Sequence, residues 1–244
     1  MAADFEGLAG FQSVVSSRYF GERRGEWIFR GHSDAAYRLV PSVGRDVHSS
    51  RSRGKYERSL LAQFRRQSLP HVPRLPSNEF EWLALAQHHG LPTRLLDWSY
   101  NPLVALYFAV CAQSEHDGAV VVLRAPKMWP ARRLESDDPL SLSKPVKFVP
   151  SLVTPRLSVQ EGLFTVHTDV ERPLEQDLRP DWRIESIRVA SGQKQRLKYE
   201  LYRVGVHESD LFPGLDGLAR HLRWKHTVLP QIEEMSPEDM EDEV

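Results

Sequence analysis

The sequence predicts an α+β fold, in which a small central sheet is flanked by helices in a single mixed domain over residues 1–230. Strand-like and helix-like stretches follow one another irregularly, which favours this class over a regular βαβ alternation. The chain has 244 residues, of which 41% are hydrophobic, so it can bury a substantial core. There is no internal repeat, and the acidic residues 231–244 are predicted to form a disordered tail.

The helices are predicted from their start and stop signals. The strongest covers residues 79–90, because a Ser-Asn pair precedes it, acidic residues occupy its first turn and a glycine ends it. The next covers residues 102–113 and begins at an Asn-Pro pair; it is apolar nearly all round, which indicates burial. Further helices are predicted over residues 5–20, 56–68, 191–205 and 212–226.

The strands are predicted from alternating or β-branched runs between turn signals. They cover residues 26–32, 93–98, 118–125, 161–169 and 182–190. The first is expected to end at Gly31, where the chain can turn sharply. The second follows a Leu-Pro pair that forces extended backbone. Residues 43–55 are basic and rich in serine, so we expect a loop there.

The composition excludes several classes of protein. The 32 basic and 33 acidic residues nearly cancel, so the field of the whole protein does not favour nucleic acid or membrane. The single cysteine, Cys111, excludes an internal disulfide and argues against a cysteine-rich zinc module. The N-terminus has no signal-peptide pattern and no apolar run reaches membrane-spanning length, so cytoplasmic residence is expected.

Polar side chains crowd the segment between the two strongest predicted helices. They surround a Gly-Leu-Pro turn and a short strand, and comprise His88, His89, Thr93, Arg94, Asp97 and Ser99. Polar groups in a buried setting must be paired within the protein or used for binding. Two interpretations stay open: a structural ion pair of Asp97 with Arg94 or Arg30, or a ligand site on which these groups converge.

Three common kinds of site are not expected. His88 and His89 are adjacent and point apart on a helix, and no second cysteine supports zinc, so no metal is expected. No G-x-S-x-G elbow marks a nucleophilic serine, and the lone thiol lies in an apolar helix. The sequence also lacks a P-loop and a G-x-G-x-x-G fingerprint.

Four segments carry a family resemblance. They read WIFRGHSDAAYRLVPSVGR, WLALAQHHGLPTRLLDWSYNPLVALYFA, SVQEGLF and LYRVGVHESDLFPGLDGLARHL. In this order they resemble the successive signatures of FRG-domain proteins, and the resemblance extends from about Phe11 to His226. The long second segment is its most specific part. The chain is thereby identified as an FRG-type domain over residues 1–230.

The order of certain residue types is also similar to that of mono-ADP-ribosyltransferases. In those enzymes an arginine ends one strand, a serine or threonine ends a second strand that precedes a helix, and a glutamate lies on a third. Arg30, Ser99 and Glu161 occupy that order here. The resemblance implies an ADP-ribosyltransferase-like fold. It also implies an NAD-dependent transferase that acts as a toxin or phage-defence effector on a macromolecular acceptor that the sequence does not identify.

The implied site has a catalytic set and an NAD-binding set. The catalytic set is Arg30, Ser99, Glu161 and Asp97, and the NAD-binding set is Arg30, His88, Thr93, Arg94 and Tyr107. An arginine fork can hold a pyrophosphate, a hydroxyl can fix the ribose, and a carboxylate can stabilise an oxocarbenium-like centre as nicotinamide leaves. If position 161 need not be acidic, Asp97 or Glu57 would take its place. Tyr107, Phe108 or Trp98 could stack on the nicotinamide ring.

Two other functions stay open. A non-catalytic module could bind RNA or protein through basic residues, namely Arg45, Arg51, Arg53, Lys55, Arg65 and Arg66. A metal-independent nuclease or phosphodiesterase could use His88, His89 and Asp97 as acid and base, since histidine titrates near neutral pH. None of these functions requires a membrane.

Overall fold

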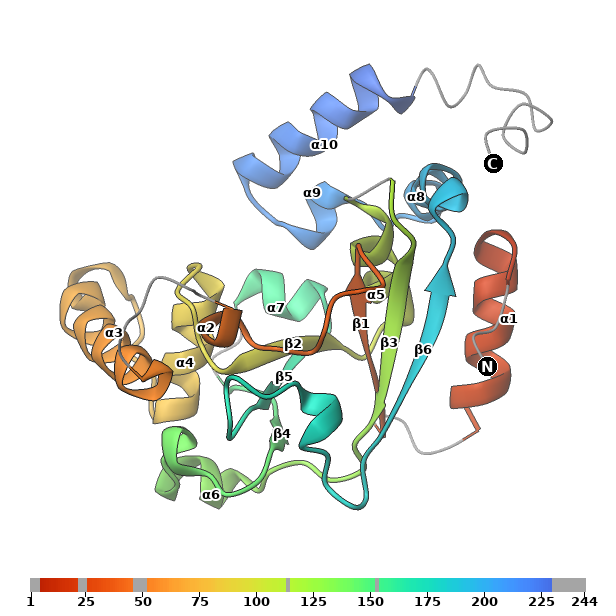
Figure 1. Ribbon diagram of the computed structural model, residues 1–244. Helices are drawn as coiled ribbons and strands as arrows, with labels where there is room; N and C mark the ends of the chain where they lie inside the picture. The colour runs from red at the N-terminus through yellow and green to blue at the C-terminus, as the bar shows by residue number, and fades with distance from the viewer. Residues whose placement is uncertain (1–4, 22–25, 46–51, 113–114, 152–153, 230–244) are drawn as a thin grey trace.

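The protein is built on a six-stranded antiparallel sheet with the strand order β4-β5-β2-β1-β3-β6 (Figure 1). The computed structural model describes residues 5–21, 26–45, 52–112, 115–151 and 154–229. Its strands are β1 Trp27–His32, β2 Leu95–Ser99, β3 Gly118–Arg124, β4 Val146–Phe148, β5 Gly162–Val166 and β6 Arg183–Val189. The predicted α+β class is confirmed, while the predicted tail, 231–244, lies outside the described residues.

Helices lie around this sheet. They are α1 Gly7–Tyr19, α2 Ser42–Arg45, α3 Arg53–Ser68, α4 Glu79–His88, α5 Pro102–Val110, α6 Ala131–Ser136, α7 Pro155–Val159, α8 Lys194–Arg203, α9 Glu208–Leu211 and α10 Leu215–Thr227. Short 3-10 helices cover Leu69–His71, Pro139–Ser141, Leu174–Gln176 and Ser191–Gln193. No helix among the described residues is both long enough and apolar enough to span a bilayer.

The sheet has two halves that meet at one residue pair. Strands β1 and β2 are in register only at Phe29 and Ser99, whereas β1 pairs with β3 along its whole length and β2 pairs fully with β5. In Figure 1, β2 accordingly runs across the direction of β1, β3 and β6. Because β1 and β2 diverge beyond that pair, the side chains at their ends face an opening instead of a neighbouring strand.

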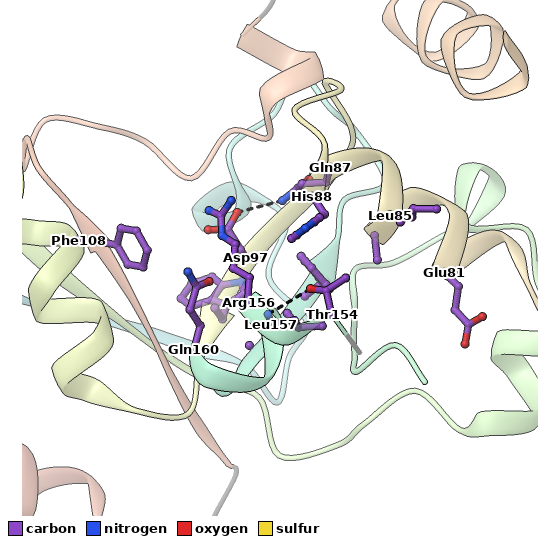
Figure 2. A pocket seen from close by; sticks show the side chains of 14 residues that line it. Glu81, Leu85, Gln87, His88, Asp97, Phe108, Thr154, Arg156, Leu157 and Gln160 are labelled. Carbon is purple, nitrogen blue, oxygen red and sulfur yellow. Dashed lines mark hydrogen bonds between the residues drawn. The ribbon is translucent and has the colours of Figure 1, made fainter. Parts of the chain in front are cut away.

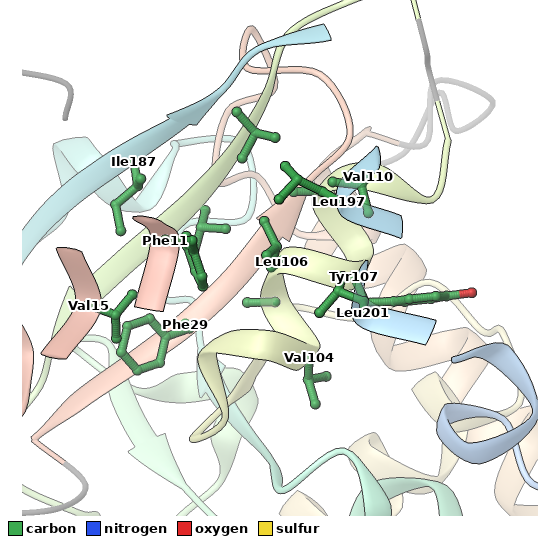
Figure 3. Packing of buried hydrophobic residues seen from close by; sticks show 14 of the residues in the cluster. Phe11, Val15, Phe29, Val104, Leu106, Tyr107, Val110, Ile187, Leu197 and Leu201 are labelled. Carbon is green, nitrogen blue, oxygen red and sulfur yellow. The ribbon is translucent and has the colours of Figure 1, made fainter. Parts of the chain in front are cut away.

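The largest apolar cluster lies between the β1-β3-β6 half and three helices, α1, α5 and α8 (Figure 3). Phe11 from α1, Phe29 from β1, Leu106 from α5 and Leu197 from α8 are all fully buried in it. Each such side chain contributes on the order of 1.5–3 kcal/mol to folding. Helix α5 packs on β1 on one side and on α8 on the other, which explains why it is apolar nearly all round.

The second cluster covers the β4-β5-β2 half. Helices α3, α4 and α6 pack there, with Phe80, Leu83 and Phe148 at the centre. Helix α4 begins as predicted, because the Asn78 side chain accepts a hydrogen bond of 3.0 Å from the Glu81 amide. A buried α4 therefore fixes the position of the polar turn that follows it.

The three residues of the Phe-Arg-Gly tripeptide in β1 have different surroundings. Phe29 enters the core, and Arg30 extends toward the opening beside β2. Gly31 lies against α5, where an added Cβ would be 2.0 Å from the Ala105 carbonyl oxygen and 2.6 Å from the Ala109 amide nitrogen. The prediction that the strand turns at Gly31 is wrong, because β1 continues to His32; the glycine is needed for close approach of α5.

Some predicted boundaries are also wrong. The expected loop over residues 43–55 contains most of α2, and α3 begins at Arg53 instead of at residue 56. Residues 46–51 lie outside the described part of the chain. The short elements β4, α6, α7 and α9 were not predicted, since none is long enough to show a clear periodicity.

Candidate functional site

A cleft opens where β1 and β2 diverge. It consists of two adjoining cavities of about 280 Å³ and about 170 Å³, whose walls share Asp97, Trp98, Phe108 and Gln160. The larger cavity, which we call the arginine lobe, is lined by Arg30, His32, Tyr37, Arg38, Arg45 and Ser99. The smaller cavity, the apolar lobe, is lined by Ala84, Leu85, His88, Arg156, Leu157 and Phe164 (Figure 2).

Arg30 and Asp97 form the boundary between the lobes. Arg30 Nη1 lies 2.8 Å from Asp97 Oδ2 and donates a hydrogen bond of 2.7 Å to the Asp97 carbonyl oxygen. Arg30 Nε donates to His32 Nε2 at 3.2 Å, so this imidazole is neutral with its proton on Nδ1. Of the two ion pairs proposed from the sequence for Asp97, the structure contains the one with Arg30.

Asp97 is a solvent-accessible carboxylate inside a concave site. Its side chain is 63% exposed, against 16% for Arg30, yet protein surrounds it on the cleft floor. Desolvation in the cleft acts to raise the pKa of Asp97, but the Arg30 charge, hydrogen bonds to the carboxylate and the Arg156 charge together hold the pKa below its ordinary value. Gln87 Nε2 donates to Asp97 Oδ1 at 3.0 Å, as Figure 2 shows. Asp97 is therefore ionised and oriented.

Thr93 supports this arrangement from behind the cleft. Its hydroxyl donates a short hydrogen bond to Gln87 Oε1, and its amide donates to Ser42 Oγ at 3.0 Å. Thr93 is buried and does not line either lobe. The structure thus places this predicted NAD-binding residue one step away from the cleft, where it holds Gln87.

Arg94 is not brought to the cleft. Its guanidinium is buried against Glu57, with Nη2 2.8 Å from Oε2, and it also donates to the carbonyl oxygens of Pro139 and His167. Glu57 accepts the Arg94 amide at 2.7 Å as well. Both side chains are fully engaged in a structural ion pair, so Glu57 is not positioned to replace a catalytic carboxylate.

Ser99 reaches the cleft, and Glu161 does not. Ser99 ends β2, lines the arginine lobe and donates to the Gln160 carbonyl oxygen at 2.6 Å. Gln160 lines both lobes and donates from Nε2 to the Leu211 carbonyl oxygen at 2.9 Å. Glu161 is exposed, has φ 45° and lies outside the lining of either lobe. Of the predicted catalytic set, Arg30, Asp97 and Ser99 meet in one cleft.

Three further arginines line the cleft that contains Asp97. Arg38 and Arg45 line the arginine lobe, and Arg156 lines the apolar lobe and stacks on Phe212 at 4.4 Å. Burial and the neighbouring Arg30 charge lower the pKa of Arg45, and burial lowers the pKa of Arg156. Within the described residues none of these three groups has an ion-pair partner.

The other carboxylate of the cleft wall is not available. Glu81 is buried in the apolar lobe and accepts hydrogen bonds from Ser77 N at 2.7 Å and Ser77 Oγ at 2.9 Å. Among the described lining residues, Asp97 is therefore the accessible carboxylate in a site with four arginines. Such a site favours anions, and an arginine fork suits phosphate oxygens.

The aromatic lining differs from the prediction in one residue. Phe108 and Trp98 line both lobes, but Tyr107 packs in the α1-α5-α8 cluster and faces α8. His88 lines the apolar lobe, where burial lowers its pKa, with a smaller effect from His89. Tyr107 is thus not placed for stacking on a ligand in the cleft, whereas Phe108 is.

The residues predicted for nucleic-acid or protein binding, and those predicted for a nuclease, do not come together in one site. Arg51 lies outside the described residues, Arg53 pairs with Glu171, and Arg65 pairs with Glu79. Arg45 faces the cleft, so the predicted basic residues do not form one free surface. His89 is exposed and outside the cleft lining, which separates it from His88 and Asp97.

No cluster of three or more metal-ligating side chains occurs in the part of the chain that the structure describes. Residues that sequence reasoning missed are Gln87, Arg38, Arg156 and Gln160. All but Arg156 lie inside segments that carry the family resemblance, and Gln160 directly precedes the proposed Glu161. No sequence signal distinguishes Arg156.

Comparison with known families finds a match in the segment that forms most of the cleft. The FRG domain matches residues 25–118, which include β1, β2, α4 and α5 and hence most of the arginine lobe. No curated protein and no solved structure matches the chain. The resemblance seen in residues 158–222 lies outside the matched segment and stays a prediction, as does that to ADP-ribosyltransferases. Residues 25–118 of the chain therefore match an FRG domain.

Proposed function

We propose that the cleft binds NAD and that the protein transfers its ADP-ribose to an acceptor. One observation carries this proposal: among the described residues, four arginines and one accessible carboxylate, Asp97, line the cleft beside an aromatic wall. A nucleotide offers the matching features, namely phosphate charge, a sugar and flat rings. Strands β5, β2 and β1 are neighbours in the sheet. Because β2 lies next to β1, Arg30 and Ser99 reach one opening.

The two lobes suit different parts of the ligand. In the arginine lobe, Arg30, Arg38 and Arg45 would hold the pyrophosphate through charge-assisted hydrogen bonds. At the boundary, Phe108 offers a ring face for stacking, and the Asp97 carboxylate favours a cationic pyridinium ring nearby. NAD meets both requirements, whereas a nucleoside triphosphate lacks the cationic ring.

The proposed reaction is a glycosyl transfer. The bond between the nicotinamide nitrogen and ribose C1′ breaks, and its electron pair leaves with nicotinamide. The Asp97 carboxylate stabilises the positive charge that develops on C1′. A nucleophile, either water or an acceptor side chain, then bonds to C1′ and releases its proton to solvent. Asp97 takes the role first assigned to Glu161, because among the described residues that line the cleft it is the accessible carboxylate.

The experiment separates binding from cleavage. Calorimetric titration with NAD and chromatographic detection of nicotinamide would be carried out on wild type, Arg45→Ala, Asp97→Asn and the exposed control Arg132→Ala, which lies on α6. We expect Arg45→Ala to weaken NAD binding about tenfold, the loss of one charge-assisted contact. Asp97→Asn should still bind NAD but release no nicotinamide. Absence of NAD binding by the wild type would refute the proposal.

The same variants test the biological role. Expression of the wild-type chain in bacteria should lower cellular NAD and slow growth, as expected of a toxin or defence effector. Asp97→Asn should do neither, while Arg132→Ala should match the wild type. Normal growth and normal NAD with an active purified enzyme would argue against the toxin role and leave the transferase chemistry intact.

A further inference from the structure

Helix α10 carries an apolar side that does not pack on the protein. Leu215, Leu218 and Leu222 are 82%, 43% and 44% exposed and recur at helical spacing on one side. The side toward the body carries the buried Gly217 and His221 instead. In Figure 1, α10 lies at the upper edge of the fold, above α9. We call Leu215, Leu218 and Leu222 the leucine stripe.

The leucine stripe differs from the other exposed apolar side chains of the described residues. Those occur singly on separate elements, such as Leu69 in a 3-10 helix and Val204 after α8. Isolated exposed apolar residues are ordinary, but a contiguous row along a helix is typical of a surface that another helix covers. A surface helix also needs only one apolar side to pack on its own domain.

Basic side chains flank the leucine stripe. At 100° per residue, Lys225 lies on one flank and Arg223 on the other, and both are exposed. The remaining arginine of α10, Arg220, already pairs with Glu208. One carboxylate, the exposed Asp216, lies on the same flank as Arg223 and acts on Arg220. Arg223 and Lys225 still leave a net positive charge beside the stripe, which favours a partner with acidic residues at matching positions.

We propose that the leucine stripe binds an amphipathic helix of another protein, apolar on one side and acidic along its flanks. The site would lie beside the cleft. Phe212, which precedes α10, has its ring 5.9 Å from Phe108 and stacks under the Arg156 guanidinium, and both of those residues line the cleft. This inference stands on α10 alone and does not depend on NAD chemistry.

The test uses two fluorescein-labelled synthetic helical peptides with leucines on one side. One has glutamates on its flanks and the other has lysines there. We expect the full chain to bind the glutamate peptide at least about tenfold more tightly than the lysine peptide, in a fluorescence anisotropy titration. Leu218→Ser combined with Leu222→Ser should abolish binding, whereas Leu69→Ser should leave it unchanged. Circular dichroism would verify that each variant is folded.

Charge reversal makes the test specific. Arg223→Glu combined with Lys225→Glu should reverse the preference, so that the lysine peptide binds more tightly. Equal binding of both peptides, or of neither, would overturn the proposal. So would self-association of the wild type in sedimentation velocity that Leu218→Ser with Leu222→Ser removes, because the stripe would then bind a second copy. Much tighter peptide binding after the acidic residues of 231–244 are replaced by amides would identify that segment as the occupant instead.

Discussion

Arg30 contacts Asp97 twice through the same nitrogen, Nη1. This nitrogen lies 2.8 Å from Asp97 Oδ2 and donates a hydrogen bond of 2.7 Å to the Asp97 carbonyl oxygen. The two residues are 67 positions apart and come from strands that are in register at a single pair. The contact therefore joins the two halves of the sheet across the opening. It also keeps the Asp97 carboxylate ionised beside an arginine.

Removing the guanidinium should raise the pKa of Asp97. In Arg30→Ala, the largest charge that offsets desolvation of the carboxylate is lost, so the pKa of Asp97 should rise. A carboxyl-carbon NMR titration of Asp97 measures this directly. Since the wild-type pKa is lowered, the pair stabilises the fold above the unfolded pKa of about 3.9 and loses that contribution as the pH falls through the folded pKa. Arg132→Ala should leave the Asp97 titration unchanged.

Gln160 should matter more than Glu161 for ligand binding. Gln160 lines both lobes and is held by the Leu211 carbonyl oxygen, whereas Glu161 lies outside the cleft lining. Gln160→Ala should therefore weaken NAD binding about tenfold, the worth of one well-placed hydrogen bond, while Glu161→Gln changes neither binding nor nicotinamide release. The reverse result, with Glu161→Gln inactive and Gln160→Ala normal, would return the catalytic role to Glu161 and remove it from Asp97.

Elements with local signals could be predicted from the sequence. Helix α4 has its cap and acidic first turn, and β3 has its β-branched run, so both occur where expected. Strand β4 could not be predicted, because it has three residues and exists by pairing with β5. The role of Gly31 was likewise hidden, since it depends on the later helix α5 lying against β1.

The candidate site was predicted only in part, for the same reason. Arg30, Asp97 and Ser99 belong to one recognisable pair of segments and do meet. The choice between Arg30 and Arg94 as the partner of Asp97 depends on the divergence of β1 and β2, which no local pattern reports. Arg156 comes from a five-residue helix and reaches the cleft only through tertiary packing.

Glu57 and Arg94 should be structural. Breaking a buried ion pair leaves an unpaired buried charge, so Glu57→Ala should lower the free energy of unfolding by about 3–5 kcal/mol. The adjacent Arg58 forms an exposed pair with Asp138 at 3.2 Å, and Arg58→Ala should cost at most about 1 kcal/mol. Urea denaturation of both variants measures the difference. Similar decreases in the free energy of unfolding would show that the buried pair stabilises the fold no more than the exposed pair does.

Gly31 should tolerate no side chain. In Gly31→Ala the new Cβ meets backbone atoms of α5, which cannot move without displacing the core, so we expect a loss of at least about 3 kcal/mol. Gly54 in α3 has no atom within 4 Å of an added Cβ, and Gly54→Ala should instead stabilise by about 0.5–1 kcal/mol. Thermal unfolding of both variants tests this. A stable Gly31→Ala would mean that α5 does not lie this close to β1.

Two buried histidines should make the fold sensitive to acid. Burial, followed by the Arg30 charge, lowers the pKa of His32 from 6.5 to about 4, and burial lowers that of His167 to about 3. Between pH 4 and 6.5 the unfolded chain therefore binds more protons than the folded protein. The free energy of unfolding therefore rises with pH through this window. The contribution of the neutral histidines is fully present above pH 6.5 and is lost as the pH falls.

The size of this effect can be measured with one variant. Each pKa unit is worth about 1.4 kcal/mol, so His32 alone should reduce the free energy of unfolding by about 2–3 kcal/mol between pH 7.5 and pH 4.5. His32→Gln keeps an acceptor for Arg30 Nε and cannot be protonated, so urea denaturation at the two pH values should show a drop smaller by that amount. The exposed His71→Gln should retain the full drop. An equal drop in His32→Gln and wild type would show that His32 is not the neutral acceptor of Arg30.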